Sequence, residues 1–235
     1  LALGLLSSAA VRACIASRHP GLPPELAERV HRRTDGHPLF VVMTLEHLQR
    51  RQRRLEGEDG RAALDGSPFE LETEIPDSLR AMIESQVERL EPAARRWLEA
   101  ASVAGIELCD ATLAHALEIP LEEVGERGRE LTRRSVFLAG AGDFDWPDGT
   151  AGRRFVFRHA LYPEILYDGI APGRRIALHR RIAERLEAAH AGSTDAIAAE
   201  LATHFERGRD RARAVVYLVA AARNASRRQA FEEAI

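Results

Sequence analysis

The sequence predicts a mainly α-helical protein made of several small units. Apolar residues recur every three to four positions through most of the 235 residues, which is the spacing of amphipathic helices. One interruption, near residues 135–157, has short Val- and Phe-rich runs around a Gly- and Asp-rich stretch, and this predicts a β-hairpin. Residues 171–235 carry small side chains where paired helices would touch, which indicates the start of an α-solenoid.

The composition favours a cytoplasmic protein without affinity for membranes. Hydrophobic residues make up 45% of the chain, charged residues 29%, and the net charge is −3, so the whole chain has no electrostatic bias toward nucleic acid or anionic lipid. Cys14 and Cys109 have no metal-type spacing and are interpreted as buried thiols in a reducing compartment. No stretch reaches the roughly 20 apolar residues of a membrane span. Leu1 and the helical pattern at Ile235 predict a piece of a longer polypeptide.

Residues 1–55 predict a first helical segment, and residues 56–74, which mix Gly, Pro and acids without periodicity, predict a linker. A break at Gly36 separates the second helix from the third, because Gly is the residue that most easily leaves the helical conformation. The expected helices are Ser7–Arg18, Pro23–Arg33 and one that begins at Pro38.

Residues 75–170 predict a winged-helix arrangement, which consists of several small helices, a hairpin and a final helix. The expected elements are helices from Pro76, from Pro92, at Ala111–Leu117 and at Leu121–Arg134, hairpin strands at Ser135–Ala139 and Arg153–Phe157, and a helix at His159–Asp168.

Residues 171–235 predict the start of tetratricopeptide-like helical repeats. A long helix with Ile182 and Leu186 on its apolar face is followed by helices at Thr194–Arg207 and Arg211–Arg227. The next unit is expected to begin near Ala230. Because such arrays need about three repeats for stability, we expect this one to continue past Ile235.

The residues predict no catalytic or metal site within the chain. All 33 basic residues are Arg, which excludes a Walker-type or Schiff-base lysine from this segment. The histidines form no H-E-x-x-H pattern and no Cys/His cluster. His179 is expected in a core, whereas His19, His47, His115, His190 and His204 are expected on helix surfaces.

Two places combine features that suit an anion. The turn Gly36-His37-Pro38-Leu39 starts a helix, where Gly allows close backbone approach and the first N–H groups are free. At Arg158-His159 a strand gives way to a helix, and both side chains can donate to a phosphate. Taken from spacing alone, a helix cap and a packed corner remain alternative interpretations of these two places.

Four stretches of sequence carry a resemblance to a known family. They are "RRTDGHPLFVV", "IPDSLRAMIESQVERLEPAARRWLEAASVAG", "FVFRHALYPEILYDGI" and "LHRRIAERLEAA". In this order they resemble the region after the P-loop core of bacterial signal-transduction ATPases of the STAND type, relatives of the NB-ARC ATPases. The resemblance covers the whole chain and implies a helical lid at 1–55, a winged helix at 75–170 and the first tetratricopeptide-like repeats at 171–235.

The resemblance also implies site residues and partners. Gly36 and Pro38 match the lid turn whose Pro packs on adenine, and His159 matches the winged-helix histidine that contacts the ADP β-phosphate. Ala160 stands where the family has Asp, and Arg158 is an alternative phosphate contact. ADP or ATP with Mg²⁺ would be held mainly by a P-loop core that these residues do not include. An inducer would bind the repeats, the ATP-bound protein would self-associate, and an output module such as a transcription factor, cyclase or kinase would be fused to it.

Two other functions remain open from the sequence. The winged helix would bind DNA through 121–134 and the wing at 140–152, but the helix has balanced charges and the wing carries Asp143, Asp145 and Asp148. Phosphate neutralisation dominates DNA affinity, so we expect no direct nucleic-acid binding by this segment. The third hypothesis is a helical-repeat scaffold without nucleotide switching.

Overall fold

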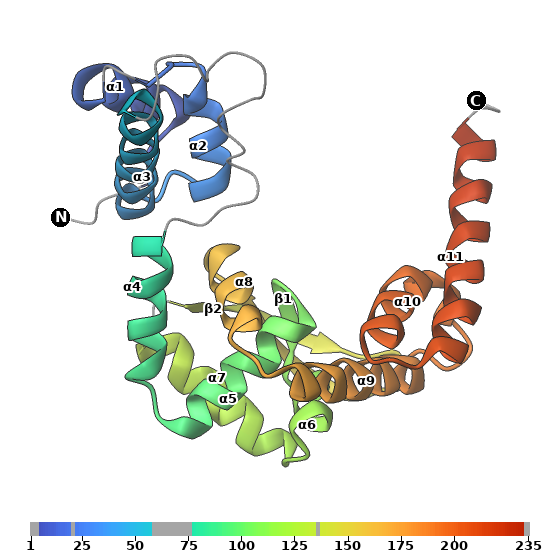
Figure 1. Ribbon diagram of the computed structural model, residues 1–235. Coiled ribbons are helices and arrows are strands. Elements are labelled where there is room, and N and C mark those ends of the chain that lie inside the picture. The colour runs from blue at the N-terminus through green and yellow to red at the C-terminus, as the bar shows by residue number, and fades with distance from the viewer. Residues whose placement is uncertain (1–4, 20–21, 58–76, 135–136, 233–235) are drawn as a thin grey trace. The chain divides into compact units, whose positions relative to one another are not determined.

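The computed structural model describes residues 5–19, 22–57, 77–134 and 137–232 (Figure 1). Within these residues the chain is mainly helical, with one small three-stranded antiparallel sheet, so the predicted fold class is confirmed at this level. The chain divides into two compact units, Leu1–Gln86 and Val87–Ile235, and each is described by itself. No described helix is both long enough and apolar enough to cross a membrane. Most of the predicted linker, from residue 58 onward, lies outside the described residues.

The first unit holds three helices around a common apolar core, followed by a fourth. Its described elements are α1 (Ser8–Arg18), α2 (Leu26–Thr34), α3 (Pro38–Gly57) and all but the last two residues of α4 (Asp77–Glu88). The core takes one stripe from each of the first three helices and includes Val11, Ile15, Val30, Val41 and Leu45.

Local sequence explains where these helices begin. The hydroxyl of Ser7 accepts a hydrogen bond from the Ala10 N–H at 3.2 Å, which caps α1. Pro23 and Pro24 precede α2 rather than open it, because their carbonyls accept turn hydrogen bonds from Leu26 and Ala27. Pro38 is the first residue of α3, where its missing N–H costs nothing.

The second unit combines the sheet with most of the helices. Its elements are α5 (Pro92–Ala104), β1 (Glu107–Cys109), α6 (Asp110–Leu117), α7 (Leu121–Arg134), β2 (Leu138–Asp145), β3 (Ala151–Phe157), α8 (Leu161–Asp168), α9 (Pro172–Ala189), the 3₁₀ turn η1 (Thr194–Ile197), α10 (Ala198–Arg207) and α11 (Arg211–Glu232). The strand order is β1-β3-β2, so the hairpin β2–β3 gains a third strand from before α6.

One part of the core of this unit lies between α5, α7 and β3. Trp97 is fully buried, its indole N–H donates to the Val124 carbonyl at 3.1 Å, and its ring stands edge-on to Phe155 at 5.5 Å. A Cβ at Gly128 would lie 2.5 Å from the ring of Phe155, so only glycine allows α7 to pack this closely on β3.

The structure corrects several predicted boundaries. The three-residue strand β1 was not predicted, and β2 extends to Asp145, through residues expected to form a turn. A register shift between Gly140 and Asp143 absorbs the glycines without ending the strand. Helix α10 starts at Ala198, after the 3₁₀ turn, and α11 continues to Glu232 instead of ending at Arg227. Residues 135–136 of the first predicted strand lie outside the described part.

Candidate functional site

Gly36 holds a turn that no other residue fits. Its φ is +69°, it follows Asp35 at φ +46°, and its carbonyl accepts the Leu6 N–H at 2.7 Å. A Cβ on Gly36 would lie 2.0 Å from the Leu6 carbonyl oxygen. Both the left-handed conformation and the close backbone approach therefore require glycine, as the sequence suggested for this turn.

Pro38 follows this turn as the first residue of α3, and His37 lies between the two predicted residues. The ring of His37 stacks on Phe40 with centroids 4.3 Å apart. Its Nδ1 is buried and has no hydrogen-bond partner among the described residues. Sequence reasoning gave His37 no role of its own, although its place between Gly36 and Pro38 was the signal that would have drawn attention to it. A buried, unpartnered nitrogen beside a helix start can bind a polar ligand atom.

His159 is buried, with 3% of its surface exposed, and lies just before α8. Its Nδ1 accepts the Leu161 N–H at 3.1 Å, so the side chain caps the helix, which begins two residues later than predicted. Because Nδ1 is an acceptor, the proton of the neutral ring is on Nε2. The ring stands edge-on to Tyr162 at 6.3 Å.

Arg158 leaves β3 with an exposed side chain that is tied to the adjacent strand. Its backbone N–H donates to Phe137 at 2.9 Å, and its Nε donates to the Leu138 carbonyl at 2.8 Å. Burial raises the pKa of Tyr162, and the positive charge of Arg158 partly opposes this rise. Arg158 and His159 belong to the second unit, whereas Gly36 and Pro38 belong to the first.

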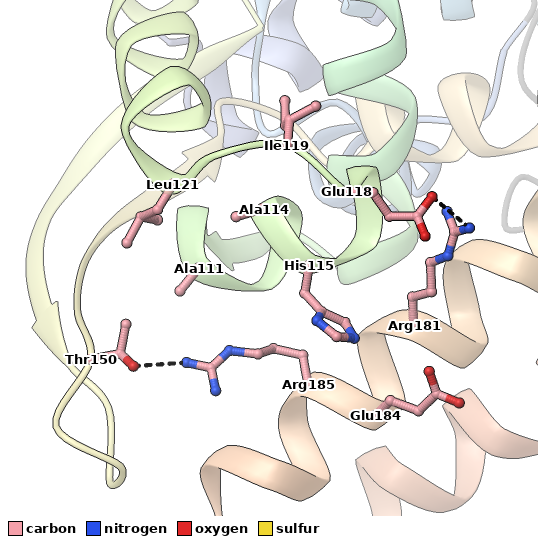
Figure 2. A pocket seen from close by; sticks show the side chains of 10 residues that line it. All are labelled: Ala111, Ala114, His115, Glu118, Ile119, Leu121, Thr150, Arg181, Glu184 and Arg185. Atoms are coloured by element: carbon pink, nitrogen blue, oxygen red, sulfur yellow. Dashed lines mark hydrogen bonds and ion pairs between the residues drawn. The ribbon is translucent and has the colours of Figure 1, made fainter.

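A cavity of about 720 Å³ lies between α6, α9 and the turn of the hairpin. Figure 2 shows apolar side chains of Ala111, Ala114 and Leu121 on one side, with His115 directed toward α9. Two arginines of α9 cross the cavity toward partners on the other elements. Arg181 pairs with Glu118 at 2.8 Å, and Arg185 donates to Thr150 at 3.2 Å (Figure 2).

Arg185 also fixes the tip of the hairpin to α9. It donates to Asp148 at 2.6 Å, and its guanidinium lies 4.7 Å from the centre of the Trp146 ring. Trp146 in turn donates its indole N–H to the Sγ of Cys109 at 3.0 Å. The hydrogen bond and charge of Arg185 hold the pKa of the Asp148 carboxyl well below its usual value.

A pair of histidines lies between α8, α9 and α10. The Nδ1 atoms of His179 and His204 are 2.9 Å apart, and the Tyr167 hydroxyl lies 3.0 Å from Nε2 of His179. The core position of His179 is confirmed. The surface positions predicted for His204 and His19 are wrong, because both are buried. His204 meets His179 of α9, and His19, just after α1, lies 3.1 Å from Gln49 of α3. The periodicity of a single helix does not identify such contacts.

In the described part of the chain, no three His, Cys, Asp or Glu side chains are grouped in a way that would hold a metal ion. No protein-family model matches the chain, and a search of the curated proteins finds no similar sequence.

Proposed function

We propose that the chain is the regulatory region of a STAND-type ATPase, which closes over ADP or ATP and Mg²⁺ held mainly by a P-loop core. In this proposal residues 1–55 form the lid, 75–170 the winged helix and 171–235 the first repeats. The ADP-bound state is closed, and exchange for ATP frees the winged helix to move, which exposes a surface for self-association while the repeats sense an inducer.

The observation that carries the proposal is the buried imidazole of His159 at the N-terminus of α8. The Leu161 N–H occupies Nδ1, so the proton of the neutral ring is on Nε2, which is buried at the same helix start. An N–H donor at a helix N-terminus is a favourable contact for a phosphate oxygen, because the helix dipole adds to the hydrogen bond. In the lid, the constrained turn at Gly36 and the unpartnered Nδ1 of His37 fit a role in contacting the base.

The order of elements in the second unit supports the winged-helix part of the proposal. A helix, a short strand, two helices and a hairpin follow one another, and the short strand joins the hairpin at the β3 edge. The helices α9, α10 and α11 pack in sequence, as antiparallel neighbours of a repeat array would do.

The contacts of the wing and of α7 argue against DNA binding. On α7, Arg127, Arg129 and Arg134 are paired with acids of the same helix. The tip of the hairpin is docked on α9 through Arg185 and Asp148. With four Glu against four Arg, α7 has no net charge, and the hairpin tip that carries Asp148 is docked on α9. Neither element offers the net positive charge on which DNA affinity depends, which favours an intramolecular role for this module.

A scaffold without nucleotide switching is the second candidate, and one surface favours it. Four large aliphatic side chains of α11 are 46–63% exposed: Val215, Val216, Leu218 and Val219. Such a patch on one helix is typical of a protein–protein contact. A scaffold would bind its partners equally well with and without ADP, whereas the switch would not.

The decisive variant is His159→Ala in a longer chain that includes the P-loop core. Loss of the phosphate contact is expected to speed ADP release by about tenfold or more, measured by stopped-flow with a fluorescent ADP analogue. His159→Asn is the matched control for the structural role, because the Asn side chain can still cap α8. Fast release in both variants supports the assignment. If His159→Asn released ADP at the wild-type rate, His159 would act only as a helix cap. The proposal would then lose the observation on which it rests.

A further inference from the structure

The second unit contains a cavity of about 550 Å³ that is bounded by α5, α6, α7 and α9 and is distinct from the one in Figure 2. Arg181 and Ile119 contribute to both cavities. None of the residues of the proposed nucleotide switch lines the smaller cavity. Its volume is within the range of small-molecule sites, which is roughly 300–1,000 Å³.

The lining of this cavity is strongly basic. Four arginines from three helices contribute to it: Arg96, Arg127, Arg174 and Arg181. Glu123 is the one acid among the described residues that line it. Arginine presents several N–H donors in a planar fork, so a cluster of this kind recognises carboxylate and phosphate groups.

Three of the arginines already have carboxylate partners, but these pairs are easily exchanged. Arg127 pairs with Glu123 at 3.2 Å, Arg174 with Glu99 at 3.3 Å and Arg181 with Glu118 at 2.8 Å. The arginines are 27–37% exposed in these pairs. Glu123 and Glu118 are 50% and 68% exposed, and the more buried Glu99 keeps a second partner in Arg95 at 3.1 Å. Exposed ion pairs contribute little stability, so a dianionic ligand can replace these carboxylates as partner of the arginines.

The helices add a second source of positive potential. Ala93 is the second residue of α5, Glu123 the third of α7 and Arg174 the third of α9, and all three line the cavity. The first turns of helices of 13, 14 and 18 residues therefore each contribute a residue to the lining. The N-terminal end of a helix carries a partial positive charge, which adds to the positive potential of the arginines.

The remaining lining is apolar. Trp97 and Leu178 border the cavity but are buried, with 0% and 3% exposed surface. The apolar lining residues that keep part of their surface exposed are Ala93, Leu117, Ile119 and Ala177. A bare ion would leave this surface in contact with water, whereas an organic group would cover it. The cavity thus combines a charged rim with an apolar wall.

We propose that this cavity binds a small organic phosphate, in which the phosphate group contacts the arginines while an apolar body packs against Leu117, Ile119 and Ala177. This ligand is separate from the nucleotide of the proposed switch. The site would give the chain a second small-molecule input, located where α9 meets α5, α6 and α7.

The test is calorimetric titration of the 235-residue chain with phenyl phosphate, which carries both chemical features and no adenine. We expect one site with a Kd on the order of 1 mM or tighter. Inorganic phosphate lacks the apolar body and is expected to bind about tenfold more weakly. Benzyl alcohol lacks the phosphate group and is expected not to bind measurably. In a Trp146→Phe background, the ligand should change the fluorescence of the remaining Trp97.

Two variants locate the binding. Arg96→Gln with Arg174→Gln should weaken phenyl phosphate by at least about tenfold, whereas Arg129→Gln, on α7 but outside the cavity, should not change the affinity. Ala177→Phe, introduced at an exposed position of the lining, should block the site without changing its charge. If the double variant fails to fold, the affinity of Ala177→Phe for phenyl phosphate tests the location of the site instead. No saturable binding of phenyl phosphate, binding unchanged in Ala177→Phe, or inorganic phosphate binding as tightly as phenyl phosphate would overturn the proposal.

Discussion

The Nδ1 atoms of His179 and His204 lie 2.9 Å apart in the contact between α9 and α10. One ring must donate and the other accept, so at least one of the two imidazoles is neutral. Burial is the main cause that lowers the pKa of His179 to about 3 and that of His204 to about 4, and the charges of Arg175 and Arg207 add to it. Tyr167 of α8 closes the cluster with its hydroxyl on His179.

We predict that the second unit loses stability in mild acid. Both folded pKa values lie below the ordinary value of 6.5, so the unfolded chain binds more protons as the pH falls. Stability is therefore fully present above about pH 6.5 and is lost progressively toward pH 4. At pH 5 each ring should cost on the order of 1–2 kcal/mol in the free energy of unfolding, which urea denaturation at several pH values measures.

His204→Gln is the control for this prediction. It removes one titrating ring and its effect on the other, so the free energy of unfolding should fall less steeply between pH 7 and pH 5. In His115→Gln, at an exposed position on α6, the free energy of unfolding should fall between pH 7 and pH 5 as steeply as in the wild type. An equal slope in wild type and His204→Gln would show that the pair does not control the acid response.

Gly36→Ala should destabilise the first unit strongly. The substitution forces an L-residue to φ +69° and brings its Cβ into the Leu6 carbonyl, at a combined cost of about 2–5 kcal/mol. Gly192→Ala tests the backbone strain alone, because the φ of Gly192 is +91° and a Cβ there would meet no other atom. We expect this substitution to lower the free energy of unfolding by about 1 kcal/mol. Thermal unfolding monitored by circular dichroism compares them. Equal losses from the two substitutions would contradict the close approach at Leu6.

Gly128→Ala and Gly173→Ala should change stability in opposite directions, although both lie in helices. At Gly128 the new methyl would meet the buried ring of Phe155 at 2.5 Å, and overpacking of this kind costs about 1–3 kcal/mol. At Gly173, in the first turn of α9, the methyl meets nothing, and the gain in helix propensity should stabilise by up to about 1 kcal/mol. Urea denaturation measures both. A stabilising Gly128→Ala would contradict the tight packing of α7 on β3.

Arg185→Ala should release the hairpin tip from α9. The variant loses the hydrogen bonds to Asp148 and Thr150 and the contact with the ring of Trp146. We expect amide exchange at Gly149 and Trp146 to become about tenfold faster or more while α10 keeps its protection. Arg133→Ala, on the exposed side of α7, is the control. Unchanged exchange at the tip would mean that this contact does not restrain the hairpin.

Much of the helical framework was predictable because amphipathic periodicity and capping residues act locally. Pro38 and Pro92 mark the starts of α3 and α5, and Gly36 marks the break before α3, each through its own backbone preference. The predicted range Leu121–Arg134 is the helix α7 without change.

What depends on contacts distant in sequence was not predictable. Strand β1 is only three residues long and exists through its pairing of Leu108 with Phe155. The glycines and aspartates of 140–145 suggest a turn, yet pairing with β3 extends the strand through them. His204 has the sequence context of an exposed residue and is buried only because His179 of α9 meets it. At the candidate site, the sequence indicated Gly36 and His159, but the His159 hydrogen bond to Leu161 required coordinates.

The most direct test of the nucleotide switch is calorimetric ADP binding, measured on the 235-residue chain and on a longer chain that begins with the P-loop core. The account predicts tight ADP binding by the longer chain alone, weakened by Pro38→Ala and by His159→Ala. Absence of ADP binding by both chains, or tight binding that neither substitution changes, would contradict it and would favour the scaffold.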